Sequence, residues 1–204
     1  MKAIAFRKHG GPEVLEMMDL PVPEPKPHEV RVKVMAVALN HLDLWVRKGW
    51  PSLKLPLPHV LGSDVAGIVE KLGSEVPPRH LNTHVVINPG LSCGGCERCL
   101  SGEDVLCEQY KILGEDVAGG YAQFVCVPYT NLLPKPQRLN FTDAACLPLT
   151  FLTASHMLFS RAQLKAGETI LIHAAGSGVG SAAVQLAKLV GAKVIATAST
   201  AAKL

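Results

Sequence analysis

Alternating apolar and polar residues in the first part of the chain predict short β-strands. Val30-Arg31-Val32-Lys33-Val34 alternates strictly, as is typical of a half-buried strand. Ala3–Lys8 and Leu15–Asp19 are expected to pair as a hairpin across a Gly-Gly-Pro turn, and further strands are expected at 60–72, 84–88 and 122–127. Because Gly and Pro residues separate these segments, the pattern favours a barrel-like all-β domain.

Two helices are expected among and after these strands. His41–Lys48 has Leu42, Trp45 and Val46 at helical spacing, and both Trp45 and the nearby Trp50 are expected to serve in packing. A second helix is expected to begin at Thr142 as its N-cap and to run to about residue 159. Pro148 is expected to kink this helix, which would join the β domain to the segment that follows.

The last stretch, Glu168–Thr200, has the pattern of strand, glycine turn, helix and strand. Apolar runs at Ile170–Ile172 and Val194–Ala198 flank an apolar helix at Ala182–Val190, which Gly191 ends. Strands that are apolar on both faces and joined by a helix indicate a parallel sheet.

The glycine turn of this stretch is a candidate site for a dinucleotide pyrophosphate. Its backbone N–H groups can approach an anion, and the N-terminus of the following helix adds partial positive charge. The strict G-x-G-x-x-G is not met, because Ala175 and Ser177 occupy the first two glycine positions, and a plain tight turn is the alternative. The candidate cofactor-binding residues of the turn are Gly176, Ser177, Gly178, Val179 and Gly180.

Composition narrows the class of protein. The chain has 204 residues, of which 48% are hydrophobic, enough for one large domain or two small ones. A net charge of +3 without a basic run argues against nucleic-acid binding. No apolar run approaches the roughly 18 residues that span a bilayer, and the N-terminus lacks the apolar core of a signal peptide. We therefore expect a cytoplasmic protein that acts on a small molecule and binds no membrane.

Four of the six cysteines lie close together, in the pattern Cys93-x-x-Cys96-x-x-Cys99-x7-Cys107. Four thiolates at this spacing can surround one ion tetrahedrally, as Zn²⁺ prefers, and a site with four protein ligands is structural rather than catalytic. An iron–sulfur cluster, two disulfides or four unligated thiols are the alternatives. The remaining Cys126 and Cys146 lie in apolar runs and are expected in the core.

Together these features resemble the medium-chain dehydrogenase/reductase superfamily. The resemblance is carried by the segments 38–44 (ALNHLDL), 61–67 (LGSDVAG), 119–122 (GGYA), 147–153 and 175–180, and by the cysteine lobe, in that order along the chain. It implies a β plus α/β fold in which a GroES-like β-barrel domain at 1–130, with a structural zinc lobe at 91–111, precedes a linking helix and a partial Rossmann domain at 131–204. The remaining strands of a Rossmann domain are absent, so the resemblance also implies a truncated form. A complete chain is expected to form a homodimer or tetramer.

The resemblance places a catalytic zinc site where this sequence lacks the usual ligands. The positions of its Cys, His and second Cys match Asn40, Ser63 and, less securely, Leu149, none of which supplies a thiolate or imidazole. Leu42 stands where the superfamily relays the alcohol proton. The chain therefore resembles the quinone oxidoreductase-like branch, which reduces quinones or activated double bonds without that metal. Asn40 and Asp43 are the candidate catalytic residues; Asp43 and Asp64 have a structural role as the alternative.

The resemblance also implies the residues that bind the nicotinamide cofactor. His41 matches a position near the cofactor phosphates and Thr153 one near the nicotinamide, with simple hydrogen-bonded structural roles as the alternative. At the end of the second strand the acid that would bind the ribose of NAD is replaced by Ala198, followed by Ser199, Thr200 and Lys203. Hydroxyls and a lysine donate to a 2′-phosphate, so we expect NADP(H), unless these residues merely begin a helix.

Two other functions remain open at this stage. The alternatives to a quinone or enone reductase are a catalytically silent fragment or binding module that keeps the fold, and a zinc-dependent alcohol dehydrogenase with atypical ligands.

Overall fold

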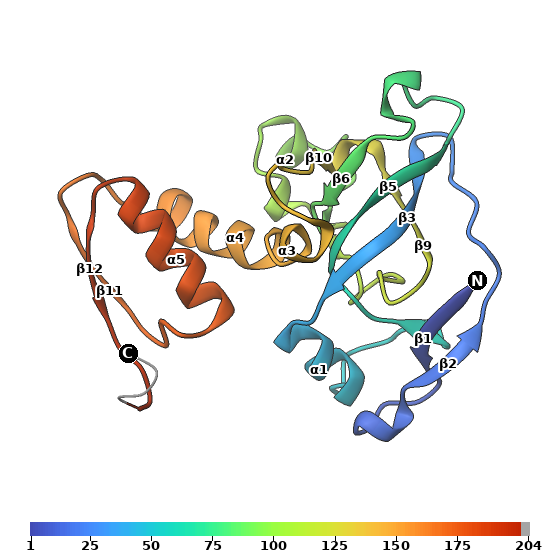
Figure 1. Ribbon diagram of the computed structural model, residues 1–204, viewed down its shortest axis with the longest axis horizontal. Coiled ribbons are helices and arrows are strands. Elements are labelled where there is room, and N and C mark those ends of the chain that lie inside the picture. Colours follow the sequence, from blue (N-terminus) through green and yellow to red (C-terminus); the bar gives the residue numbers. More distant parts are fainter. Residues whose placement is uncertain (201–204) are drawn as a thin grey trace. The chain divides into compact units, whose positions relative to one another are not determined.

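The computed structural model describes residues 1–200 and divides the chain into two compact units, Met1–Cys146 and a second unit that begins at Leu147 (Figure 1). The division falls after Cys146 rather than after residue 130. Strand β10 (Leu132–Pro134) pairs with the main sheet, and helix α3 (Phe141–Ala145) packs on two of its strands, so residues 131–146 belong to the first unit.

The first unit is built on a five-stranded antiparallel sheet in the order β10-β6-β5-β3-β9. Its longest strand, β3, lies between β5 and the edge strand β9 and places Val32 opposite Val69 on one side and Val125 on the other. The strands of this sheet are β3 (Glu29–Ala38), β5 (Asp64–Leu72), β6 (His84–Ile87), β9 (Phe124–Pro128) and β10.

Two smaller sheets complete the strands of this unit. β1 (Lys2–Phe6) pairs with β2 (Glu16–Asp19) in the antiparallel register Lys2↔Asp19 to Ala5↔Glu16, so the predicted hairpin is confirmed. β4 (His59–Val60) joins the other edge of β1, and β7 (Gly90–Leu91) pairs with β8 (Lys111–Ile112).

Apolar side chains from β3, β5, β6 and β9 form the main core. Val30 and Val32 are fully buried, whereas Arg31 between them is half-buried and Lys33 is exposed, which confirms the alternation seen in the sequence. Leu113 reaches the same core from the loop after β8 and is also fully buried.

The single strand expected at 60–72 is divided into β4 and β5. Gly62 between them has a φ of +103°, and an added Cβ there would lie 2.5 Å from the ring of Tyr121. This left-handed conformation interrupts the ladder, and only glycine adopts it readily.

The helices and turns of the first unit are short. α1 (His41–Lys48) has the expected bounds, but Trp45 is 59% and Trp50 39% exposed, so their expected role in packing is not met within this unit. Its other helical segments are α2 (Glu97–Leu100), α3 and 3₁₀ turns at Pro12–Val14, Pro78–His80, Asp104–Leu106 and Tyr129–Asn131.

The long helix expected from Thr142 is wrong in its cap and its continuity. Asn140 is the N-cap of α3, and its side chain accepts a hydrogen bond from the Asp143 N–H at 2.8 Å. Pro148 does not kink a helix; it lies in the first turn of a new one, α4 (Pro148–Ser155), where its missing N–H costs nothing. Cys146, expected in the core, is exposed between the two helices.

The second unit contains α4, a π-helical segment (His156–Arg161), β11 (Thr169–Ile172), α5 (Gly178–Leu189) and β12 (Lys193–Ala196). β11 and β12 pair in parallel, which confirms the predicted strand–helix–strand arrangement. Ala182 and Ala187 of α5 pack with Ile172 in its core.

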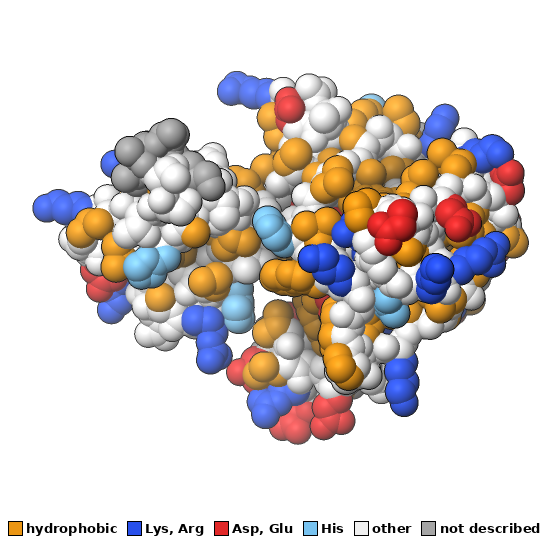
Figure 2. Space-filling view, turned by 90° about the horizontal axis from the view of Figure 1, so that it is seen from below, with side chains coloured by type: hydrophobic (Ala, Val, Ile, Leu, Met, Phe, Trp, Pro, Cys, Tyr) orange, Lys and Arg blue, Asp and Glu red, His pale blue; other side chains and the backbone are white. Residues whose placement is uncertain are grey.

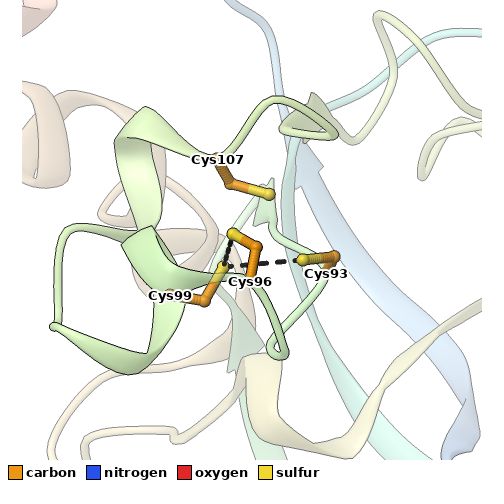
Figure 3. A group of neighbouring side chains, drawn as sticks. All are labelled: Cys93, Cys96, Cys99 and Cys107. Atoms are coloured by element: carbon orange, nitrogen blue, oxygen red, sulfur yellow. Dashed lines mark hydrogen bonds between the residues drawn. The ribbon is translucent and has the colours of Figure 1, made fainter.

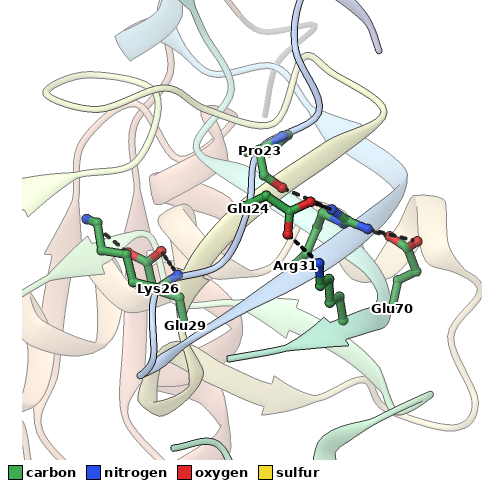
Figure 4. A network of polar contacts seen from close by, with 7 residues as sticks. Pro23, Glu24, Lys26, Glu29, Arg31 and Glu70 are labelled. Atoms are coloured by element: carbon green, nitrogen blue, oxygen red, sulfur yellow. Dashed lines mark hydrogen bonds and ion pairs between the residues drawn. The ribbon is translucent and has the colours of Figure 1, made fainter. Parts of the chain in front are cut away.

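Charged side chains hold the proline-rich segment before β3 against the sheet. The guanidinium of Arg31 pairs with Glu24 and with Glu70 of β5, each at 3.0 Å, and Glu24 also pairs with Lys71 (Figure 4). Lys26 pairs with Glu29 in the same region. Elsewhere, on the face drawn in Figure 2, Lys and Arg side chains lie scattered among hydrophobic and uncharged groups. In residues 1–200 no helix has the length and apolar character needed to cross a membrane.

Truncating Leu113 tests the core of the first unit. Leu113→Ala is expected to lower the free energy of unfolding by about 2–5 kcal/mol, because it leaves a cavity among fully buried side chains. Leu81→Ala, at a side chain that is 45% exposed, is expected to change it by less than about 0.5 kcal/mol. Urea unfolding followed by circular dichroism measures both; equal losses would contradict this core assignment.

Candidate functional site

The four cysteines of the lobe meet at one point (Figure 3). The sulfur atoms of Cys93, Cys96, Cys99 and Cys107 all lie within 4.8 Å of one another. The Cys93–Cys99 separation is 3.8 Å and the Cys96–Cys99 separation 3.4 Å. Sulfur ligands about 2.3 Å from a tetrahedral zinc ion lie about 3.8 Å apart, so this donor set fits such an ion.

Local structure of the lobe explains the convergence. Cys96 is the N-cap of α2 and Cys99 lies within it, so the C-x-x-C spacing places both on one face of a helical turn. Cys107 follows the 3₁₀ turn Asp104–Leu106, and an ion pair between Arg98 and Glu103 at 2.7 Å braces the connection.

The pKa values of Cys93 and Cys96 are shifted in opposite directions. The N–H groups of Gly95 and Cys96 stabilise the Cys93 thiolate and lower its pKa to about 6. The Cys99 N–H favours a thiolate at Cys96 as well, but the sulfur neighbours and burial outweigh it and raise the pKa of Cys96 to about 11. A bound cation would favour the thiolate form of both cysteines, since it stabilises every thiolate that it binds.

A second polar cluster surrounds the buried carboxylate of Asp43. One of its oxygens, Oδ2, accepts hydrogen bonds from the Asn40 N–H at 2.7 Å and from the Tyr121 hydroxyl at 3.0 Å. The other, Oδ1, accepts from the Gly62 N–H at 3.1 Å. With Asp43 only 3% exposed, these three donors compensate the burial of its charge and give it the contacts of a positioning residue.

Asn40 is held by two partners at the start of α1. Its backbone is bound by Asp43, and its side-chain Nδ2 donates to Oδ2 of the buried Asp64 at 2.9 Å. One amide hydrogen is thereby committed, while the second hydrogen of the amide can donate to a further partner.

Ser63, next to Asp64, is fully buried, and its Oγ has no hydrogen-bond partner among residues 1–200. Leu149, the third residue matched to a metal ligand, lies on α4 in the second unit. The side chains at and beside Asn40 and Ser63 offer carboxylate, amide and hydroxyl oxygens to a metal, whereas zinc sites are dominated by thiolates and imidazoles. This chemistry does not fit a zinc site of the usual kind.

The sequence indicates Tyr121 only as part of a turn, and the hydrogen bond of its hydroxyl to Asp43 was not predicted. Burial, reinforced by the carboxylates of Asp43 and Asp64, raises the pKa of Tyr121 well above its usual value, so the phenol stays protonated and donates. Tyr121 and Asp43 are far apart in sequence, so no local pattern predicts their hydrogen bond. The Gly-Gly-Tyr sequence predicts only the turn.

The glycine turn of the second unit has the geometry of an anion-binding helix start. Ser177 is the N-cap of α5 and accepts from the Gly180 N–H at 3.0 Å, with Gly176 before it and Gly178 and Val179 in the first turn. Gly180 is required here, because an added Cβ would lie 2.3 Å from the Ala174 carbonyl oxygen. The remaining first-turn N–H groups of such a helix attract an anion.

The other expected cofactor residues have simpler surroundings. Thr153 donates its hydroxyl to the Leu149 carbonyl of its own helix at 2.7 Å, which is a structural contact. His41 is exposed at the first position of α1, 6.2 Å from the Trp45 ring. Ser199 and Thr200 lie just beyond β12, and Lys203 lies outside the described residues. Their roles toward a cofactor stay predictions.

One further contact at this end of the sheet was not anticipated. His173 follows β11 and Thr197 follows β12, and their Nδ1 and Oγ1 atoms are 3.0 Å apart. This contact joins the carboxyl ends of the two parallel strands, the edge at which open α/β sheets bind ligands.

Known proteins resemble the chain along almost its whole length. Residues 26–137 match the alcohol dehydrogenase GroES-like domain family. The quinone oxidoreductase of Mus musculus is 36% identical over 98% of this chain, which spans 53% of that protein. The chain thus covers about half the length of the curated relatives it matches.

Solved structures agree with these matches. An NAD-dependent alcohol dehydrogenase is 58% identical with a TM-score of 0.96, covering all of this chain and 60% of that protein. A cobalt- and zinc-bound thermostable alcohol dehydrogenase from Pyrobaculum aerophilum is 36% identical with a TM-score of 0.90, covering 99% and 60%. The predicted fold, a GroES-like β domain followed by the start of a Rossmann domain, is thereby confirmed.

Removing the Tyr121 hydroxyl tests the Asp43 cluster. Tyr121→Phe is expected to lower the free energy of unfolding by about 1–3 kcal/mol, because a buried carboxylate loses a donor. Since the folded-state pKa of Tyr121 is raised, its contribution is complete below the unfolded pKa of about 10 and is lost as pH rises beyond it. The difference between wild type and variant is therefore expected to stay constant from about pH 6 to 9 and to shrink above about pH 10, as measured by urea unfolding.

Tyr129→Phe is the matched control, because the Tyr129 ring is half-buried and contacts His80 by its ring. A loss at Tyr129 as large as that at Tyr121 would contradict the assignment.

Proposed function

This chain belongs to the medium-chain dehydrogenase/reductase superfamily, and on that premise we propose that it serves an oxidoreductase that transfers hydride from NADPH to a quinone or another activated carbonyl or enone. The substrate is a small molecule and the protein is cytoplasmic. In its complete form the protein is a homodimer or tetramer. Hydride transfer is the chemistry that a bound nicotinamide supplies; the residues of this chain supply position and polarity.

The observation that carries the proposal is the polar cluster of Asn40, Asp43, Ser63 and Asp64. Asn40 and Ser63 stand at two of the positions matched to catalytic zinc ligands, and the cluster contains neither a thiolate nor an imidazole. An electron-poor acceptor needs no metal when hydrogen bonds polarise its carbonyl. Asn40, clamped by Asp64 and by Asp43, is the group we propose for this role.

Asp43, proposed from the sequence as catalytic, is better supported as a positioning residue. All three of its hydrogen bonds join parts of the protein to one another, from Asn40, Gly62 and Tyr121. By fixing the backbone of Asn40 it would orient the amide toward an acceptor.

The cofactor proposal concerns the second unit. Gly176, Ser177, Gly178, Val179 and Gly180 would hold the pyrophosphate at the start of α5. His41 and Thr153 are proposed to contact the phosphates and the nicotinamide. Ser199, Thr200 and Lys203 are proposed to donate to a 2′-phosphate, since no acid stands at Ala198.

The cysteine lobe is proposed to bind one structural zinc ion through Cys93, Cys96, Cys99 and Cys107. Its sulfur separations fit a tetrahedral ion, and a site with four protein ligands has no open position for substrate. When bound, zinc would stabilise the fold of the lobe, in which the apolar side chains of Leu100, Val105 and Leu106 are exposed.

A zinc-dependent alcohol dehydrogenase with atypical ligands is the second candidate, favoured by the 58% identity to a protein named as an NAD-dependent alcohol dehydrogenase. A silent binding module is the third. Metal content separates the first two, because an atypical catalytic site adds a second ion. Oxidation of NADPH with a panel of quinones, enones and aldehydes separates the first from the third.

The purified chain is expected to contain close to one zinc per chain, measured by plasma mass spectrometry. Cys107→Ser is expected to abolish this zinc and to lower the melting temperature, because it removes a buried ligand. Cys146→Ser, at an exposed cysteine outside the lobe, is expected to change neither. Two ions per chain in wild type would favour the alcohol dehydrogenase, and zinc retained in Cys107→Ser would contradict the proposed ligands.

NADPH is expected to bind more tightly than NADH, as measured by the fluorescence of the reduced nicotinamide. Ala198→Asp is expected to reverse this preference by about tenfold or more, because a carboxylate binds the ribose of NADH and repels a 2′-phosphate. Ala162→Asp adds the same charge at an exposed position that ends the π-helical segment and is expected to leave the preference unchanged. Tighter binding of NADH by wild type would overturn the cofactor proposal.

A further inference from the structure

A cavity lies on the first unit over the edge of the main sheet. Its volume is about 590 Å³, within the range of small-molecule pockets. β6, β10 and the 3₁₀ turn Pro78–His80 contribute its walls. None of these residues belongs to the cysteine lobe, the Asp43 cluster or the glycine turn.

All the fully charged side chains that line this cavity are positive. Arg79 and Lys135 contribute full positive charges, and His80 and His84 contribute imidazoles, whereas the lining residues of the described chain include no Asp or Glu. Lys135 is fixed, since its ammonium donates to the Pro136 carbonyl at 3.0 Å and to that of Leu139. Arg79 is exposed, so its guanidinium is available to an anion.

His80 contributes its ring to the wall of the cavity. Its ring lies 5.5 Å from the ring of Tyr129, and its Nε2 atom is buried without a hydrogen-bond partner among residues 1–200. The turn that carries it is closed by the Thr83 hydroxyl, which donates to the His80 carbonyl at 2.6 Å. Because this nitrogen is closed off from solvent, the ring offers a ligand in the cavity a packing surface rather than this atom.

The rest of the wall is apolar. Leu132 and Leu133 of β10 and Val85 of β6 line it, and Leu133 is 51% exposed although it lies in a paired strand. Such a wall would cover the hydrocarbon part of a ligand whose charged end meets Arg79.

We propose that this cavity binds a small organic anion, with an apolar body against Leu132 and Leu133 and a carboxylate or phosphate held by the exposed side chains of Arg79 and His84. The site is separate from the proposed oxidoreductase chemistry and does not depend on it. Edge strand β10 is anchored beside it, because the Lys135 N–H donates to the His84 carbonyl at 2.9 Å, so the cavity has a rigid floor.

Isothermal titration calorimetry of the zinc-loaded chain with phenyl phosphate and benzoate tests the proposal, with inorganic phosphate and benzyl alcohol as the probes that lack one half of the ligand. At least one organic anion is expected to bind at one site per chain. Arg79→Gln is expected to weaken it by about tenfold, as the loss of a charged hydrogen bond does. His80→Phe, which keeps a ring against Tyr129, is expected to leave binding unchanged, because the buried nitrogen does not reach the ligand.

Arg7→Gln is the matched control, since Arg7 is exposed and lies outside the cavity lining, and it is expected to leave binding unchanged. If His80→Phe fails to fold, the exposed Arg79→Gln still decides. The proposal is overturned if neither organic anion saturates a site at millimolar concentration, or if Arg79→Gln binds as wild type does. It is also overturned if inorganic phosphate or benzyl alcohol binds as tightly as the organic anions.

Discussion

The buried carboxylate of Asp43 is the constraint on which the first unit's polar site depends. It receives one hydrogen bond from the start of α1, one from the turn at Gly62 and one from Tyr121 after the Gly-Gly turn. A charge that is 97% removed from solvent is tolerated only when it is well paired, so these three segments must meet wherever Asp43 is buried. Asn40 and Asp64 take their positions from this junction, because one is the neighbour of Asp43 along the helix start and the other bonds to Asn40.

The two clusters of the first unit differ in what holds their members together. In the cysteine lobe, a short helix and a 3₁₀ turn bring four residues from one short segment to a point, and the sulfur separations fit an ion that would complete their bonding. In the Asp43 cluster, the donors and acceptors satisfy one another, apart from the hydroxyl of Ser63. The cysteine lobe therefore needs a metal ion to complete its bonding. The Asp43 cluster is already hydrogen-bonded, and the amide of Asn40 has a hydrogen for a further partner.

The second unit presents its chemistry through backbone rather than side chains. The Ser177 hydroxyl caps α5 by accepting a hydrogen bond from the Gly180 N–H, and Gly180 is needed because the Ala174 carbonyl leaves no room for a Cβ. Both requirements are met by an Ala-Gly-Ser-Gly-Val-Gly turn that departs from the strict glycine pattern. The departure at Ser177 thus supports the helix start instead of weakening it.

Much of the fold followed from the sequence, because it depends on local spacing. The alternation of Val30 to Val34, the strand–helix–strand pattern after Glu168 and the C-x-x-C-x-x-C spacing each determined an element or cluster that the structure contains. Two local predictions were wrong. Asn140 caps α3 in place of Thr142, because both residues can serve as an N-cap. Pro148 starts a helix that it was expected to bend, because proline is also tolerated in the first turn of a helix. Contacts between distant residues had no local signal, so the hydroxyl of Tyr121 on Asp43 and the orphaned nitrogen of His80 emerged only from the tertiary structure. The sequence by itself determined most of the elements and the cysteine cluster, since these are set by spacing along the chain. The tertiary structure decided which polar groups are paired, since burial and pairing depend on how the segments pack.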